Sequence, residues 1–303
     1  MLTLLTHPAC RLHANGPGHP ESPQRLEAIE ARLEQDLVAR GVARWLEAPA
    51  VADEDLLRVH TAAHLARLER VHHAGGGALD SDTAMGAHSL EAARRAAGAA
   101  VLAAERAMRG EGPSFCATRP PGHHATPSQA MGFCLFNNAA VATRTALERC
   151  GAERVLIVDW DVHHGNGTAD AFRREPRVRY VSIHQWPWYP GTGDARDVGA
   201  GNLFHVPRRP GLPAATYTAD LLAAVDRAVA GFAPSLVVFS AGFDGLRDDP
   251  LGGFTWEPDD YAALTLAVRE RTPQAAVVSV LEGGYDPPRL AAAAARHAAA
   301  LAA

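Results

Sequence analysis

The chain has 303 residues, with 29 Lys+Arg against 34 Asp+Glu and a formal net charge of -5. Because like charges form no block, the composition argues against a nucleic-acid partner and against an anionic membrane surface. A chain of this length can bury roughly three quarters of its unfolded surface in one α/β domain, so we expect a single domain over residues 1–303.

The first residues and the cysteines both bear on the cellular compartment. The start, "MLTLLTHPACRLH", has no basic segment followed by a long apolar run, and no later apolar span is long enough to cross a bilayer. The four cysteines lie far apart without a CxxC pair, which argues against a disulfide framework and against a cysteine zinc site. We therefore expect a soluble, cytoplasmic protein, for which a homo-oligomer is compatible with the sequence.

Runs typical of buried strands alternate along the chain with stretches that carry apolar residues at helical spacing. The predicted strands are "TLLTH" near the start, "PSFCATR" from Pro113, "RVLIVDW" from Arg154, "VRYVSIH" from Val178, "SLVVFSAG" from Ser235 and "AAVVSVLEGG" from Ala275. The predicted helices cover Glu21–Gln35, Ser89–Met108, Asn138–Arg149, Ala214–Ala230, Asp259–Arg271 and the Ala-rich tail after Pro288. This alternation predicts a mostly parallel sheet with helices on both faces.

Polar clusters follow most of the predicted strands. They read "RPPGHHA", "DWDVHHGNG", "HQWPWYPGTGD", "GFDGLRDDPLGG" and "EGGYD" in chain order. In a parallel sheet, binding groups gather beyond the carboxyl ends of the strands, and these ends lie at one edge. We therefore expect the clusters to converge on one site.

A metal site is predicted from Asp161, His163 and Asp244. Asp161 and His163 are two residues apart, so an extended backbone directs both side chains to one side. Asp244, at the end of another strand, completes three N and O donors and leaves a position open for water and substrate, as in catalytic zinc sites. The alternative is a turn-capping aspartate beside a hydrogen-bonded buried histidine.

Two adjacent histidines, His123 and His124, lie in a loop fixed by Pro and Gly. In metal-assisted hydrolysis, one imidazole could take a proton from water while the other, kept charged, helps the amine to leave. Asp159 and Asn166 could orient the two rings and raise their pKa values by different amounts. The alternative is a surface loop with two histidines that have no catalytic role.

Aromatic residues complete the predicted site. Tyr285 follows two glycines and could donate a hydrogen bond to a carbonyl oxygen as it becomes an oxyanion. A structural tyrosine with a hydrogen-bonded hydroxyl is the alternative. Phe133, Trp186, Trp188 and Tyr189 could form the walls of an apolar channel, or could belong to the core.

Taken together, these motifs resemble the zinc-dependent histone deacetylase family, and its class II branch and bacterial amidohydrolase relatives in particular. The resemblance rests on "GPGHPESPQRL", "RPPGHHA", "GFCLFNNAAVA", "VDWDVHHGNGT", "YPGTGD", "SAGFDGLRDDPLGG" and "LEGGYD", which occur in the family's order over nearly the whole chain. It implies a three-layer α/β/α arginase–deacetylase fold and hydrolysis of acetyl-lysine or a related acyl amine. The substrate would be a small acylated amine or an acetyl-lysine protein.

The resemblance also implies a role for each site residue. Zinc would be held by Asp161, His163 and Asp244, with iron(II) or cobalt(II) as alternatives. His123 matches the general base, His124 the second catalytic histidine, Asp159 and Asn166 their partners, and Tyr285 the phenol that polarises the carbonyl. Gly132 matches the backbone acceptor for the substrate amide, and Phe133 and Tyr189 match the two sides of the acyl-lysine tunnel. A potassium ion is expected near Asp159, Asp161, His163 and Ser182.

Three other functions are weighed against this one. An arginase-like dinuclear manganese enzyme needs further carboxylates, but residues 165 and 166 are Gly and Asn. A non-catalytic acyl-ligand-binding protein of acetoin utilisation would be expected to lose a catalytic residue, and none is lost. An acetylpolyamine amidohydrolase shares the catalytic motifs.

The substrate is predicted from Leu251. Related enzymes that prefer polyamines carry an acidic residue at the tunnel mouth, and in one branch it stands where this chain has Leu251 in "DPLGG". A leucine tolerates an aliphatic acyl-lysine stem and offers no charge to an ammonium, so we expect acetyl-lysine-type substrates to be preferred. Asp248 or Asp249 could supply the missing charge. His64 and "MGAHS" from Met85 depart from the family pattern outside the catalytic set.

Overall fold

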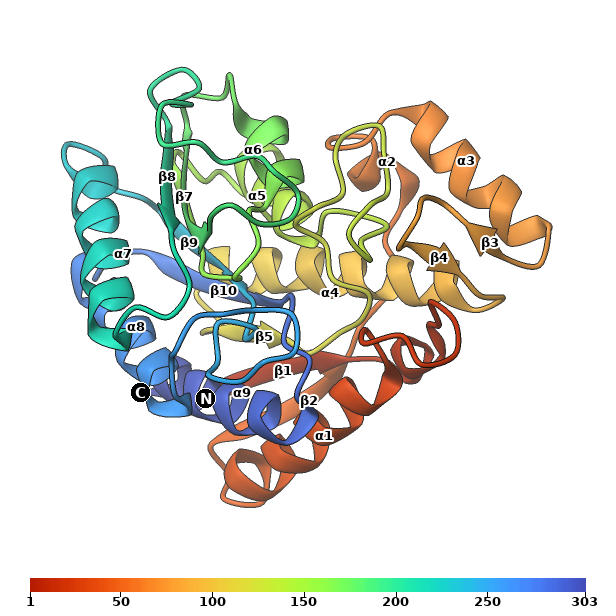
Figure 1. The fold of residues 1–303 in the computed structure, drawn as a ribbon, viewed down its shortest axis with the longest axis horizontal. Coiled ribbons are helices and arrows are strands. Elements are labelled where there is room, and N and C mark those ends of the chain that lie inside the picture. The colour runs from red at the N-terminus through yellow and green to blue at the C-terminus, as the bar shows by residue number, and fades with distance from the viewer.

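One parallel sheet forms the centre of the computed structural model, which describes residues 1–303 (Figure 1). Its eight strands have the order β2-β1-β5-β10-β9-β6-β7-β8. Each strand runs parallel to its neighbours. The strands are β1 (Leu2–Thr6), β2 (Ala43–Glu47), β5 (Ser114–Cys116), β6 (Val155–Asp159), β7 (Val178–Gln185), β8 (Leu203–Arg208), β9 (Leu236–Ala241) and β10 (Ala276–Leu281). A separate antiparallel pair is formed by β3 (Gly77–Ala78) and β4 (Ala84–Met85).

The predicted parallel sheet is confirmed, but the sequence analysis does not predict its two edge strands, β2 and β8. Both are only partly buried, and β8 contains Pro207. An edge strand faces solvent on one side, so it needs no continuous apolar run and tolerates a proline. The apolar signal that identifies the inner strands is therefore weak at the edges.

Helices cover both faces of the sheet, as predicted (Figure 1). They are α1 (Pro23–Leu33), α2 (Asp53–Leu56), α3 (Ala62–His73), α4 (Ser89–Met108), α5 (Asn138–Arg149), α6 (Asn166–Phe172), α7 (Ala214–Val229), α8 (Pro258–Arg271) and α9 (Pro287–Ala302). A 3-10 turn, η1, covers Pro8–Leu12, and a π-helical turn, η2 (Glu34–Val38), continues α1. Of these, α2, α3 and α6 are not predicted from the sequence.

Alternation along the inner strands divides the core into two layers. In β6, Leu156 and Val158 pack in the cluster that includes α1, α7, α8 and α9. Val155 and Ile157 pack on the opposite face, with α4, α5 and α6. Each such side chain contributes about 1.5–3 kcal/mol when fully buried, and this burial on both faces fixes the position of β6 in the sheet. The polar residues that follow β6 are thereby held at the carboxyl ends of the strands, between β9 and β7.

Two further predictions can be compared with the structure. The four cysteines are unpaired, as expected. No helix combines the length and the apolar character that a bilayer span requires.

Candidate active site

The three predicted metal ligands meet at the ends of two neighbouring strands. Asp161 and His163 follow β6, Asp244 follows β9, and these two strands are paired in the sheet. The ligand atoms of the three residues all lie within 4.8 Å of one another. His163 Nδ1 lies 3.0 Å from Asp161 Oδ1 and 3.1 Å from Asp244 Oδ2. The structure thus brings together residues that are up to 83 positions apart in the sequence (244 − 161 = 83).

The surroundings of this triad suit a divalent cation. A Cβ atom at Gly242 would collide with the Asp161 carboxylate, and one at Gly283 would collide with the Asp244 carboxylate. Both carboxylates are also held by backbone donors, with Gly283 N 2.8 Å from Asp161 Oδ2 and Val162 N 2.9 Å from Asp244 Oδ1. Two buried carboxylates this close to each other need a compensating positive charge. Two carboxylates and one imidazole supply three N and O donors, and catalytic zinc sites likewise use three protein ligands and keep one position open.

The charge of His163 depends on the same carboxylates. Burial disfavours its charged form, but hydrogen bonds to Asp161 and Asp244 outweigh burial and raise the pKa of His163 to about 10. A cation that binds this imidazole must therefore displace a proton. Burial and the neighbouring Asp161 raise the pKa of Asp244 to about 7. The predicted potassium site near Asp159 and Ser182 stays a prediction.

The tandem histidines stand beside the triad, and each has the partner that the sequence predicts. His123 Nδ1 lies 3.1 Å from Asp159 Oδ2, and His124 Nδ1 lies 2.8 Å from Asn166 Oδ1. The two ring centroids are 4.0 Å apart. Tyr180 on β7 donates a hydrogen bond to the same Asp159 oxygen at 2.8 Å, which fixes that carboxylate. Both imidazoles are thus oriented through Nδ1.

The different partners give the two histidines different charge states. Burial disfavours a charged His123, but the carboxylates of Asp161 and Asp159 outweigh burial and raise the pKa of His123 to about 10. Burial and the positive charges of His123 and His163 hold the pKa of His124 well below its usual value. At neutral pH one ring is therefore an imidazolium and the other a neutral imidazole.

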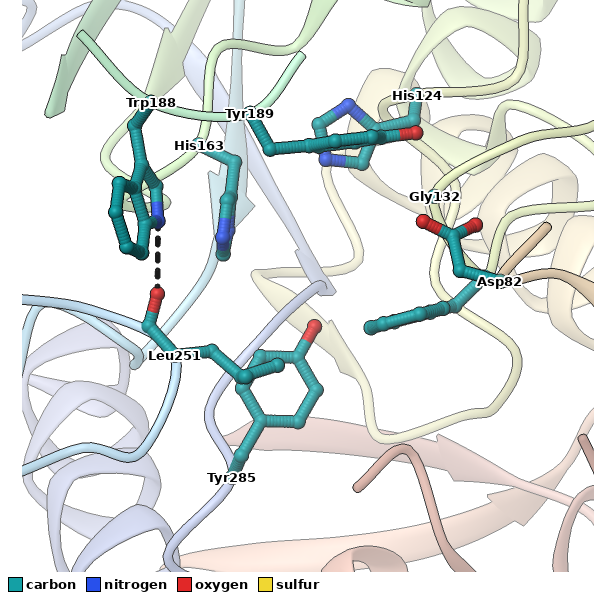
Figure 2. A pocket seen from close by; sticks show the side chains of 9 residues that line it. Asp82, His124, Gly132, His163, Trp188, Tyr189, Leu251 and Tyr285 are labelled. Atoms are coloured by element: carbon teal, nitrogen blue, oxygen red, sulfur yellow. Dashed lines mark hydrogen bonds between the residues drawn. The ribbon is translucent and has the colours of Figure 1, made fainter. Parts of the chain in front are cut away.

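A cavity of about 200 Å³ opens above the triad (Figure 2). It is lined by Asp82, His124, Gly132, Phe133, His163, Trp188, Tyr189, Leu251 and Tyr285. Of the two histidines in the tandem pair, only His124 faces this cavity. A Cβ atom at Gly132 would collide with the His124 ring, so glycine is required there. Trp186, which the sequence suggested as a wall residue, does not line the cavity.

Aromatic rings and an apolar side chain form much of the cavity wall. The ring of Tyr189 lies edge-on to His124 with centroids 5.1 Å apart, and Phe133 meets Tyr285 at 6.0 Å. The Trp188 indole nitrogen donates to Leu251 O at 3.0 Å, which joins two rim loops (Figure 2). These contacts give a narrow, largely apolar passage to the triad.

Tyr285 directs its hydroxyl group into the cavity, as Figure 2 shows. Its backbone N donates to Asp249 Oδ2 at 2.7 Å, and the Arg25 guanidinium lies 5.0 Å from its ring centroid. Burial and the Asp244 carboxylate raise the pKa of the phenol well above its usual value, so it stays a hydrogen-bond donor. Asp249 is buried and accepts this hydrogen bond from the Tyr285 backbone, so its carboxylate does not turn toward the mouth of the cavity. Asp248 is exposed.

Three residues of the site are missed by the sequence analysis. Asp82, from the β3–β4 hairpin, places a carboxylate in the cavity lining, opposite Leu251 (Figure 2). Tyr180 supports Asp159, and Glu282 is a fully buried acid beside the tandem histidines. Two features of the sequence could have indicated these residues. One is the acidic pair in "DSDT", which contains Asp82, and the other is the ionisable side chains of Tyr180 and Glu282 within or directly after apolar strands.

Comparisons with known proteins agree with this geometry. The family model of the histone deacetylase domain matches residues 19–301. The chain is 42% identical over 279 residues to a histone deacetylase-like amidohydrolase of Pseudomonas aeruginosa, covering 89% of this chain and 73% of that protein. It is 38% identical over 295 residues to a probable deacetylase of Methanothermobacter thermautotrophicus, covering 95% and 87%.

A solved structure shows the same fold. The crystal structure of the HDA15 HD domain superposes with a TM-score of 0.94 at 36% sequence identity, over 99% of this chain and 90% of that one. The three-layer arrangement expected from the sequence is thus confirmed. The chain is therefore a member of the histone deacetylase family, a hydrolase that acts on acetylated amides.

Proposed function

We propose that this protein is a metal-dependent deacetylase that hydrolyses the amide of acetyl-lysine or a closely related acyl amine. One observation carries the proposal: His163 of the Asp161–His163–Asp244 triad, the His124 imidazole and the Tyr285 phenol line the same cavity. A Lewis acid site, a base and an oxyanion donor are the groups that amide hydrolysis requires.

A divalent ion held by the triad would polarise the acyl carbonyl and make a nearby water more acidic. His124 is the residue we assign as general base, because it is neutral and faces the cavity. His123, whose pKa is raised by the carboxylates of Asp161 and Asp159, would stabilise negative charge that develops during the reaction. The resemblance implied His123 as the base, and the geometry favours the reverse assignment.

The leaving amine needs a proton when the carbon–nitrogen bond breaks. His124 gains a proton when it activates water, and it can then pass this proton to the amine nitrogen. The Tyr285 hydroxyl would donate a hydrogen bond to the carbonyl oxygen as charge develops there, an effect of about 3–4 kcal/mol for comparable donors. Gly132, next to Phe133 in the wall, would accept a hydrogen bond from the substrate amide through its carbonyl.

The cavity lining supports a linear substrate with an aliphatic stem. Phe133 and Tyr189 would enclose the stem, and Leu251 adds an apolar contact. Asp82 favours a second candidate, deacetylation of acetylpolyamines, because its carboxylate could pair with an ammonium group. It could equally accept the backbone N–H of an acetyl-lysine peptide. We expect the peptide-like substrate to be preferred, since the apolar Leu251 faces the same passage.

Purified, zinc-loaded protein tests the proposal with an acetyl-lysine peptide, acetylputrescine and acetylspermidine. Release of acetate is measured by a coupled assay, and Tyr285→Phe serves as the matched variant. We expect Tyr285→Phe to lower kcat on the order of a hundredfold while a hydroxamate still binds, because the phenol acts mainly on the oxyanion. The absence of turnover on all three substrates by the wild type would refute the proposed function.

A further inference from the structure

We propose that Glu282 is a positioning residue that holds the tandem-histidine loop in register with the Tyr285 loop. The inference rests on the proposed function and concerns a residue that contacts neither the cavity nor the metal ligands through its side chain. Glu282 directly follows β10, three positions before Tyr285, and it is fully buried.

The carboxylate of Glu282 joins two segments that are far apart in the sequence. Its Oε2 accepts hydrogen bonds from Gly122 N at 2.6 Å and His123 N at 3.1 Å. Its Oε1 accepts from Ser240 Oγ on β9 at 3.0 Å. The tandem histidines begin at the residue whose backbone this carboxylate holds, so their loop is anchored through the main chain.

The backbone that carries Glu282 is itself held by hydrogen bonds to other segments. Arg25 donates to Glu282 O and to Gly284 O, both at 2.5 Å. Gly283 N donates to Asp161, and Tyr285 N donates to Asp249. A short segment therefore connects the histidine loop, one predicted metal ligand and the phenol.

Catalysis explains why a carboxylate is placed here. Burying a carboxylate costs several kcal/mol unless hydrogen bonds compensate it, and here the backbone N–H groups of the histidine loop supply most of these bonds, so the carboxylate and the loop depend on each other. His124 and Tyr285 must approach one carbonyl group from different sides, and an error of about 1 Å in such a pair can cost on the order of a hundredfold in rate. Because the two N–H donors belong to adjacent residues, the carboxylate constrains two consecutive peptide groups of the histidine loop.

Two substitutions separate position from charge. Burial raises the pKa of Glu282 to about 7, so Glu282→Gln keeps the length and acceptor oxygen of a side chain that is partly neutral already. Glu282→Asp keeps the acid but is one methylene group shorter, so it cannot reach both N–H groups without moving the loop. Positioning therefore predicts that Gln is tolerated and that Asp is not.

The experiment measures kcat and KM of the wild type, Glu282→Gln and Glu282→Asp, with hydroxamate affinity, metal content and Tm for each protein. We expect Glu282→Gln to retain kcat within about threefold, and Glu282→Asp to lose on the order of tenfold to a hundredfold in kcat. KM, hydroxamate affinity and metal content should stay within about twofold in both, because Phe133, Tyr189 and the triad, which would hold the substrate and the metal, keep their own contacts.

Three results would overturn the inference. Wild-type kcat in Glu282→Asp would show that the loop needs no such anchor. An equal loss in Glu282→Gln would assign the effect to charge, and a parallel loss of hydroxamate affinity would assign it to general damage. If Glu282→Asp does not fold, Ser240→Ala replaces it as the test variant. Ser240→Ala removes the hydrogen bond to Glu282 Oε1, so it should lower kcat at unchanged KM. An unchanged kcat in Ser240→Ala would contradict the inference. Inactivity of the wild type would instead refute the proposed function.

Discussion

Replacing Asn166 with Asp should move the acid limb of the pH–rate profile to higher pH. The site contains two imidazoles with comparable Nδ1 contacts, one to a carboxylate at 3.1 Å and one to an amide at 2.8 Å. The carboxylate-bound ring, His123, has a pKa of about 10 despite its burial, whereas the pKa of His124 is lowered. Asn166→Asp gives His124 the kind of partner that His123 has.

The size of the effect follows from the new charge. An opposite charge at hydrogen-bond distance raises the pKa of an imidazole by about 1–3, and a rise of about 1 corresponds to roughly 1.36 kcal/mol. A general base is active only when neutral, so raising the pKa of His124 enlarges the fraction that is protonated at a given pH. On the acid limb, kcat/KM at a fixed pH should fall about tenfold each time the pKa of His124 rises by about 1.

The assay is the pH profile of kcat/KM on an acetyl-lysine peptide, with hydroxamate binding as the control for an intact cavity. The acid limb of Asn166→Asp should lie at least about one pH unit above that of the wild type. Asn166→Gln, which keeps a neutral amide, is the matched control for altered packing. An unmoved acid limb in Asn166→Asp, with hydroxamate affinity retained, would refute the assignment of His124 as the base.

Three further predictions concern the metal, the substrate and stability. Chelation should abolish activity, and about one equivalent of zinc, iron(II) or cobalt(II) per chain should restore it. Because the ion displaces the proton of His163, whose pKa is raised to about 10, the affinity for the ion should rise with pH throughout the range below about pH 10; isothermal titration at several pH values measures this, and stoichiometric binding of two ions would contradict it. Leu251→Glu should shift the ratio of kcat/KM values for acetylspermidine and an acetyl-lysine peptide toward acetylspermidine, and Asp82→Asn should shift it toward the peptide. A preference of the wild type for acetylspermidine of about tenfold, or about 1.4 kcal/mol, would overturn the substrate prediction. Burial lowers the pKa of His297 to about 3, so the unfolded chain binds a proton that the folded chain does not: the resulting stability is present above about pH 6.5 and is lost toward pH 3 by about 1.4 kcal/mol per pH unit. Urea titrations over this range should show a shallower pH dependence for His297→Gln, and equal slopes would be inconsistent with a neutral buried imidazole.

Most of the fold and of the candidate site follow from local sequence patterns. Apolar runs such as Val155 to Val158 identify the inner strands, because a strand covered on both faces must be apolar throughout. Polar residues directly after such strands identify the site, since parallel strand ends share one edge. The triad and the partners of the tandem histidines, Asp159 and Asn166, are found by this reasoning, and the structure brings them together.

The tertiary structure alone decides which of these groups face the cavity and what charge they carry. His123 and His124 are adjacent and chemically identical in the sequence, and only their burial and their neighbours in space raise the pKa of His123 and lower that of His124. Asp82 reaches the cavity from a short hairpin, and Glu282 supports His123 across 159 positions of sequence. Such contacts join segments that are far apart in the sequence, and no periodic pattern of residues predicts which distant segments will meet. Electrostatic interaction depends on distance in space and on exclusion of water, and the packed structure determines both.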